Sequence, residues 1–131
     1  MPGYEIKIIE NSCLREHEQI RKGRLAKLLA SIKKDGHVKN PIIVDRDSMV
    51  ILDGHHRFNC LKCLGLKLCP VCLVDYRDCD IKVCPWRKGE KITKEDVLNA
   101  GITGKKFTPK TSRHIIPNRP KGLNIPLAEL Q

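Results

Sequence analysis

The segment that most constrains the fold is a short apolar run that ends in an acid, a glycine and a basic cluster. Residues 49–52 read Met-Val-Ile-Leu, which predicts a buried strand, and Asp53 and Gly54 follow directly. The next segment begins His-His-Arg at residues 55–57 and has a helical pattern that stops at Gly65. A strand, a glycine turn and a helix start in this order predict an α/β domain. Backbone N–H groups and the helix dipole form an anion site at such a junction.

Hydrophobic patterning elsewhere predicts a small mixed sheet with flanking helices. Apolar residues spaced three and four apart indicate helices, whereas β-branched or alternating runs indicate strands. We expect strands at 5–9, 41–44, 49–52 and 71–76, and helices at 21–34, 54–65 and 93–101, the last ending at Gly101. Residues 11–18 are expected to form a loop. The Pro- and Lys-rich C-terminal segment is expected to be ordered only by packing or by ligand.

The chain is strongly basic, with 25 Lys and Arg against 15 Asp and Glu among 131 residues, a formal net charge of +10. Residues 101–131 hold six of the cations and one acid, a net +5. Such an excess fits a phosphate-bearing partner, although a merely basic surface has the same composition. We expect a core domain at residues 1–86, with residues 87–131 adding a helix and a basic phosphate-binding extension to it.

Length and hydropathy favour one soluble globular domain. No stretch approaches 18 apolar residues, which excludes a membrane-spanning helix, and no secretory signal is visible at the N-terminus. A cytoplasmic location is therefore the default expectation. Residues 101–106 do not form a P-loop, because the required glycine spacing and the final Lys-Ser/Thr are absent.

The residues at the start of the second helix suit phosphate binding. Gly54 permits a tight turn, and the rings of His55 and His56 and the guanidinium of Arg57 can donate hydrogen bonds to phosphate oxygens. Chance exposure of these side chains at a strand–helix junction is the alternative. Asp53 either caps the helix or holds Mg²⁺ through water.

Residues 52–57 (LDGHHR) resemble the signature of the ParB/sulfiredoxin-like fold, in the version found in archaeal free serine kinases. Three other segments are similar to parts of that family in the same order. Residues 14–18 (LREHE) resemble its early loop, and residues 39–45 (KNPIIVD) resemble its "RNPIIVD" strand. Residues 107–114 (FTPKTSRH) resemble its second phosphate-binding segment, typically "PPKTTRH".

The resemblance implies a compact α/β (α+β) domain and a kinase that uses ADP or ATP, with Mg²⁺, to phosphorylate the hydroxyl of free L-serine. It implies that Glu18 is the catalytic base and that His56 is a second catalytic residue. Two groups would bind phosphate: Gly54, His55, His56 and Arg57, and then Lys110, Thr111, Ser112, Arg113 and His114. Asn40 and Trp86 would contact the substrate, although Trp86 fits a core position equally well, and Asp53 would hold Mg²⁺.

Other branches of this fold match less well. Sulfiredoxin chemistry needs a cysteine directly before the His-Arg pair, where this chain has His55. Chromosome-partitioning ParB proteins carry a Gly-Glu-Arg-Arg type motif and a downstream helix-turn-helix, and neither pattern is present. The alternative to a kinase is a ParB-like DNA-binding or regulatory protein that uses a nucleotide as a switch, or a nuclease.

Two of the cysteine pairs have the spacing of metal ligands. Cys60 and Cys63 form one CxxC pair, and Cys69 and Cys72 form the next, only five residues further on. We expect small, semi-buried apolar side chains in a reducing compartment. Zinc binding and disulfides, the latter known from hyperthermophilic archaea, are the alternatives.

Overall fold

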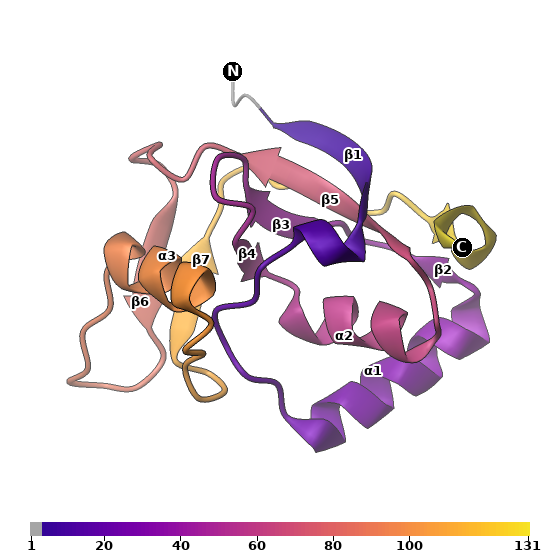
Figure 1. Ribbon diagram of the computed structural model, residues 1–131, viewed down its shortest axis with the longest axis horizontal. Coiled ribbons are helices and arrows are strands. Elements are labelled where there is room, and N and C mark those ends of the chain that lie inside the picture. The colour runs from indigo at the N-terminus through magenta and orange to yellow at the C-terminus, as the bar shows by residue number, and fades with distance from the viewer. Residues whose placement is uncertain (1–3) are drawn as a thin grey trace.

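The computed structural model describes residues 4–131 and is built on a four-stranded mixed sheet (Figure 1). Its strands are β1 (Glu5–Glu10), β3 (Ile42–Asp45), β4 (Ile51–Asp53) and β5 (Leu68–Val74), in the order β1-β5-β3-β4. β3 and β5 are parallel, whereas β1 and β4 pair with their neighbours in the antiparallel direction. The predicted fold class, a small mixed sheet with flanking helices, is therefore confirmed.

The described residues form three α-helices: α1 (Lys22–Asp35), α2 (His55–Cys63) and α3 (Lys94–Thr103). α1 packs on α2, and α2 packs on β3 and β5 (Figure 1). α1 ends at Gly36, whose φ of 73° gives the left-handed C-cap that glycine favours. Thr93 and Asp96 close α3 at its start as a capping box. Within the described residues no helix has the length and hydropathy needed to cross a membrane.

The predicted end of α3 at Gly101 is wrong, because the helix continues to Thr103 and ends at Gly104. A Cβ atom added to Gly101 would lie 2.6 Å from the side chain of Val50. Gly101 therefore serves a close approach of α3 to the sheet, and not the termination of the helix.

Two strand pairs arise from segments without a strand pattern. β6 (Lys82–Pro85) pairs antiparallel with β7 (Ser112–Ile115), and the short β2 (His37–Val38) pairs with β8 (Ile125–Pro126). In Figure 1, α3 and the β6–β7 ribbon lie at one end of the sheet, and β8 lies at the other. The proposed division after residue 86 falls between β6 and its partner β7, so strand pairing joins the two parts.

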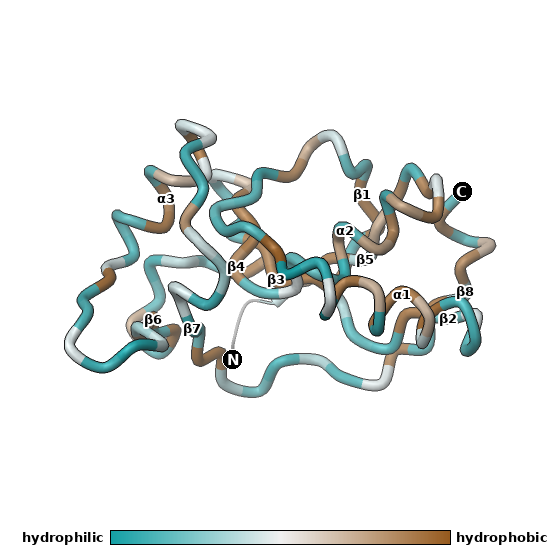
Figure 2. The backbone as a smooth tube through the Cα atoms, turned by 90° about the horizontal axis from the view of Figure 1, so that it is seen from below, coloured by the Kyte–Doolittle hydropathy of each residue, from teal (hydrophilic) through white to brown (hydrophobic). Residues whose placement is uncertain are grey.

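The sheet is covered on both faces. Ile42 and Val44 belong to a core that includes Phe58 of α2, whereas Ile43 faces a second core that includes Val97 of α3. Burial on both faces explains why β3 reads as a continuous apolar run instead of an alternating one. Figure 2 shows hydrophobic segments in the central strands and mostly hydrophilic outer loops.

The two CxxC pairs do not form one cluster. Cys60 and Cys69 are buried, with their sulfurs directed to the carbonyl oxygens of Leu25 and Ile9 respectively, and Cys72 is buried in the second core. Burial raises the pKa of the Cys69 thiol to about 12. The seven thiols are free, and these three act as small apolar core residues as expected, whereas Cys63 is exposed.

Candidate functional site

A cavity of about 540 Å³ lies where the β4–α2 junction, the first turn of α1 and the β6–β7 ribbon meet. Five cationic side chains line it, together with two carboxylates: Arg24, Arg57, Lys110, Arg113 and Arg119, with Glu18 and Asp53. The site thus unites residues from both predicted phosphate-binding segments. Its excess of positive charge suits a compact polyphosphate.

The turn between β4 and α2 requires a glycine. Gly54 has a φ of 103°, a backbone conformation that residues with a side chain rarely adopt. A Cβ atom there would also lie 3.2 Å from Nη1 of Arg57 and 3.3 Å from Cγ1 of Ile42. The close approach of β3 and the guanidinium therefore depends on the missing side chain.

We expect Gly54→Ala to lower the free energy of unfolding by about 1–3 kcal/mol and to weaken nucleotide binding, because the turn must shift. Urea unfolding and calorimetric titration with ADP measure the two effects. Gly65→Ala is the matched control, since Gly65 has a φ of 73° and open space around its Cβ position. An equal loss in both variants, with ADP binding intact, would contradict a steric role for Gly54.

The first two side chains of α2 use one ring nitrogen each to hold the backbone of the chain. Nε2 of His55 accepts a hydrogen bond from the backbone N–H of His17 (3.2 Å), and Nε2 of His56 accepts one from Arg21 (2.9 Å). Burial lowers the pKa of both histidines. Each neutral ring therefore has one donor left for phosphate, its Nδ1, and not the two that were expected.

The carboxylate of Glu18 is held by the second of the two predicted phosphate-binding segments. Its Oε1 accepts hydrogen bonds from the backbone N–H groups of Thr111 (3.0 Å) and Ser112 (2.8 Å), and from the Ser112 hydroxyl (3.0 Å). Burial raises the pKa of Glu18, and these hydrogen bonds oppose that rise. Residues 11–18 were expected to form a loop, and a β-bridge between Glu18 and Phe107 holds the end of this segment in place.

His17 lies at the centre of a histidine cluster behind the cavity. Its Nδ1 is 2.6 Å from the carbonyl oxygen of Ile51, and its Nε2 is 2.8 Å from the Ser112 hydroxyl. The rings of His55 and His114 lie 4.6 and 5.8 Å from it. Burial lowers the pKa of His17 to about 4 and that of His114 to about 3. These rings are therefore neutral near pH 7.

This cluster predicts a loss of stability in mild acid. The folded pKa of His17 lies below its ordinary value, so as pH falls below about 6.5 the unfolded chain binds protons first. The associated stability is complete above that pH, and for His17 roughly 3 kcal/mol is lost by about pH 4. Urea unfolding from pH 7.5 to 4.5 measures it. We expect a shallower dependence in His17→Asn and no change in His37→Asn, whose side chain is exposed. Equal slopes in the wild type and His17→Asn would contradict the assignment.

Trp86 lines the cavity and is not a core residue. Its side chain is 51% exposed, which shows that the core alternative is wrong. The guanidinium of Arg113 and the ammonium of Lys110 lie over its ring, at 5.4 and 5.9 Å from the centroid. These cation–π contacts keep the two cations at the mouth of the cavity.

Asp53 forms an ion pair with Arg119, which comes from the proline-rich C-terminal segment. The helix-cap alternative for Asp53 is wrong, because Gly54 is the N-cap of α2 and no side chain caps it. Mg²⁺ is commonly held by one or two carboxylates together with substrate phosphates, and the partly exposed carboxylate of Asp53 at the cavity fits that donor set.

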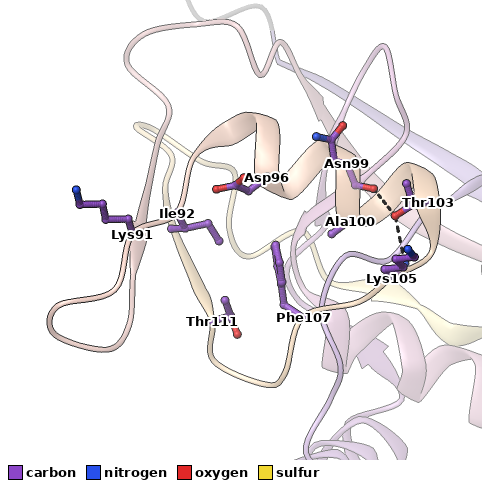
Figure 3. Close-up of a pocket in the computed structure, with 9 residues that line it drawn as sticks. All are labelled: Lys91, Ile92, Asp96, Asn99, Ala100, Thr103, Lys105, Phe107 and Thr111. Atoms are coloured by element: carbon purple, nitrogen blue, oxygen red, sulfur yellow. Dashed lines mark hydrogen bonds between the residues drawn. The ribbon is translucent and has the colours of Figure 1, made fainter.

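Two expected site residues lie elsewhere. Asn40 does not line the cavity, and its Oδ1 accepts a hydrogen bond from the backbone N–H of Gly122 (3.2 Å), so the expected substrate contact is not supported. The side chain of Thr111 lines a neighbouring groove of about 460 Å³ next to α3 (Figure 3). Its hydroxyl donates to the carbonyl of Thr108 (2.7 Å). Only the backbone of Thr111 reaches Glu18.

Sequence reasoning missed two cations of the cavity, Arg24 and Arg119. Arg24 lies on the polar side of α1, where a solvated arginine is the ordinary expectation. Arg119 lies in a segment without periodicity, and the only available signal was the concentration of positive charge near the C-terminus.

Residues 4–82 match the family described as the ParB N-terminal domain. A ParB-like protein of Sulfolobus acidocaldarius is 35% identical over 88 residues, which cover 67% of this chain and 44% of that protein. An ATP-dependent L-serine kinase of Staphylothermus marinus is 39% identical over 83 residues, which cover 60% of this chain and 33% of that protein. The chain thus spans less than half the length of these curated relatives.

A solved structure of a free serine kinase variant in complex with ADP superposes with a TM-score of 0.87. The match covers 97% of this chain and 94% of that one, at 19% sequence identity. The likeness at this identity shows the fold.

Proposed function

The chain belongs to the ParB N-terminal domain family, and we propose that it transfers a phosphoryl group from ADP or ATP to the hydroxyl of free L-serine. The product is O-phospho-L-serine. The observation that carries the proposal is the position of Glu18. The carboxylate lines a strongly cationic cavity and is bound to the backbone of the second phosphate-binding segment.

Phosphoryl transfer to an alcohol needs positioning, neutralisation of the phosphate charge and a base for the hydroxyl. In the proposed reaction, Glu18 accepts the proton of the serine hydroxyl as the serine oxygen bonds to the terminal phosphorus. The bond from that phosphorus to the bridging oxygen breaks, and the shortened nucleotide leaves with the electron pair. Burial, which raises the pKa of Glu18, makes it a stronger base than an exposed carboxylate.

The cationic side chains stabilise the charge on the transferring group. Arg57 approaches from the start of α2, while Lys110 and Arg113 approach from the β6–β7 side. Asp53 would hold Mg²⁺, directly or through water, and the ion would neutralise phosphate charge when bound. We place the serine next to Trp86, beside the cations at the mouth of the cavity.

The direct test is incubation of the protein with serine, Mg²⁺ and either ADP or ATP, followed by detection of phosphoserine by mass spectrometry. Phosphoserine with one donor supports the proposal and identifies that donor. Nucleotide binding without phosphoserine from either donor would refute it.

A second candidate function, nucleotide-switched DNA binding, is favoured by the charge of α1. Lys22, Lys27, Lys33 and Lys34 are exposed there and do not line the cavity. Tight binding to duplex DNA whose affinity falls steeply with salt would favour this function. Weak binding with a shallow salt dependence would exclude it.

A further inference from the structure

The hydroxyl of Ser112 has one proton and lies within hydrogen-bond distance of two acceptors. Its Oγ lies 3.0 Å from Oε1 of Glu18 and 2.8 Å from Nε2 of His17, and the residue is buried, with 8% of its surface exposed. A hydroxyl group carries a single proton and can donate to only one partner at a time. The partner that receives this hydrogen bond therefore depends on the protonation of the other groups.

The tautomer of His17 follows from its other contact. A carbonyl oxygen can only accept, so the 2.6 Å contact with Ile51 requires a proton on Nδ1 of His17. The ring is fully buried and neutral near pH 7, as its lowered pKa indicates. Nε2 therefore carries no proton and is an acceptor. The hydrogen bond from the backbone N–H of His17 to Nε2 of His55 holds the backbone of His17 in place.

An ionised Glu18 competes best for the Ser112 proton, because hydrogen bonds to a charged acceptor are the stronger ones. Ser112 Oγ and His17 Nε2 then face each other as two lone-pair acceptors. Once Glu18 has taken up a proton on its other oxygen, Oε1 loses its charge and keeps the two backbone N–H donors. The Ser112 hydroxyl can then turn to His17 without leaving a buried group unpaired.

We propose that Ser112 and His17 form a hydroxyl switch that makes Glu18 a better base. The Ser112 hydroxyl donates to Glu18 while the carboxylate is ionised, and it turns to Nε2 of His17 when Glu18 takes the substrate's proton. No proton leaves Ser112, whose O–H bond only rotates. His17 is a positioning residue that acts through Ser112, and the proposal rests on the role of Glu18 as base.

Other titratable groups surround the pair. They come from the 14–18 segment, α1, β4, α2, β7 and the segments beside them: Glu16, Arg24, Asp53, His55, His56, Lys106, Lys110, Arg113, His114 and Arg119. Among the described residues, only Glu18 and His17 have side chains hydrogen bonded to Ser112 Oγ. The switch therefore involves these two partners. The other groups affect the titration of Glu18 in every variant alike, so they cancel when variants are compared.

The test is an NMR titration of the Glu18 carboxyl carbon in the nucleotide-free protein, which needs no catalysis. In His17→Asn, the shorter side chain keeps a donor for Ile51 but loses the acceptor for Ser112. We expect the titration midpoint of Glu18 to fall by about 0.5–1 pH unit, which corresponds to the loss of one hydrogen bond. His17→Gln places an amide oxygen near the position of Nε2 and should restore most of the shift.

The Ser112→Ala background separates the switch from a structural role of His17. If His17 acts through Ser112, His17→Asn shifts the Glu18 midpoint in the wild-type background and has no further effect in Ser112→Ala. Equal shifts in both backgrounds, or none in either, would overturn the proposal.

A second measurement needs no His17 variant. In the wild type, the ¹⁵N signal of Nε2 should report a new hydrogen bond as Glu18 is protonated, with Nδ1 unchanged. An Nε2 signal that ignores the Glu18 titration would also overturn it.

Kinetics distinguish this proposal from the kinase proposal. In an active enzyme, His17→Asn should lower kcat about three- to tenfold with little change in the KM for nucleotide, and the acidic limb of the kcat profile should follow the shifted Glu18 midpoint. An intact switch in the NMR titration without any phosphoserine would refute the kinase reaction alone. Phosphoserine formation without the NMR shifts would refute the switch alone.

Discussion

Glu18→Gln is expected to lower kcat for phosphoserine formation by about 10²–10⁴-fold while the Kd for ADP or ATP stays within about twofold of the wild-type value. An amide cannot take the proton of the serine hydroxyl. It does keep the size of the side chain and an oxygen that can accept from the backbone N–H groups of Thr111 and Ser112. The segment should therefore stay in place while the base is lost. Single-turnover kinetics and calorimetric titration measure the two quantities.

Glu16→Gln is the matched control for this substitution. Glu16 lies two residues away, forms ion pairs with Lys62 (3.3 Å) and Lys106 (3.6 Å), and does not line the cavity. We expect its kcat to stay within about twofold of wild type, because Glu16 contacts Lys62, Lys106 and Asn59 outside the cavity and glutamine keeps an oxygen that can accept from Asn59. If Glu18→Gln reduced nucleotide affinity as much as turnover, Glu18 would be a structural residue.

Arg57→Lys is expected to lower kcat/KM for the nucleotide by about 10²–10³-fold. The substitution keeps the positive charge but removes the planar fork that binds two phosphate oxygens at once. Nη1 of Arg57 also lies 3.5 Å from the carbonyl oxygen of Pro41, so one arm of the guanidinium contacts the residue before β3 while the rest of the fork lines the cavity. Steady-state kinetics with both donors measure the change.

The control for this prediction is Arg77→Lys, the same exchange at a side chain that is 81% exposed and paired with Asp75. It should leave kcat/KM unchanged. Because Arg57 is partly buried, thermal unfolding of Arg57→Lys must accompany the kinetics. A variant with wild-type stability and wild-type kcat/KM would show that Arg57 does not bind the transferring phosphate.

Local patterning was sufficient for the central elements. The leucine and isoleucine spacing of α1, the apolar run of β3 and the glycine after Asp53 each predict the element that forms. These signals are local, since a helix face repeats within a few residues and a doubly buried strand reads as one apolar run. The fold class followed from them and from the resemblance of four separate segments to one family.

Local patterning failed where pairing partners are distant. β6 and β7 are short and of mixed polarity, and Ser112 pairs with Pro85 across a long connection that contains α3. Gly101 has the sequence context of a helix end, but it lies inside α3, where the absence of a side chain allows the helix to approach Val50 closely. Propensity describes what a segment favours alone, and tertiary contacts overrode it at these positions.

The sequence by itself determined which chemical groups are available: an acid after a histidine in an early segment, a Gly-His-His-Arg turn and a basic segment that ends in Ser-Arg-His. Only the tertiary structure decided which atoms of these groups face one another. Glu18 and Ser112 meet across a separation of 94 residues, and Arg119 reaches Asp53 across 66. Such contacts form because strand pairing brings the ends of long loops together, and the local hydrophobic periodicity of the sequence does not indicate which loop ends will meet.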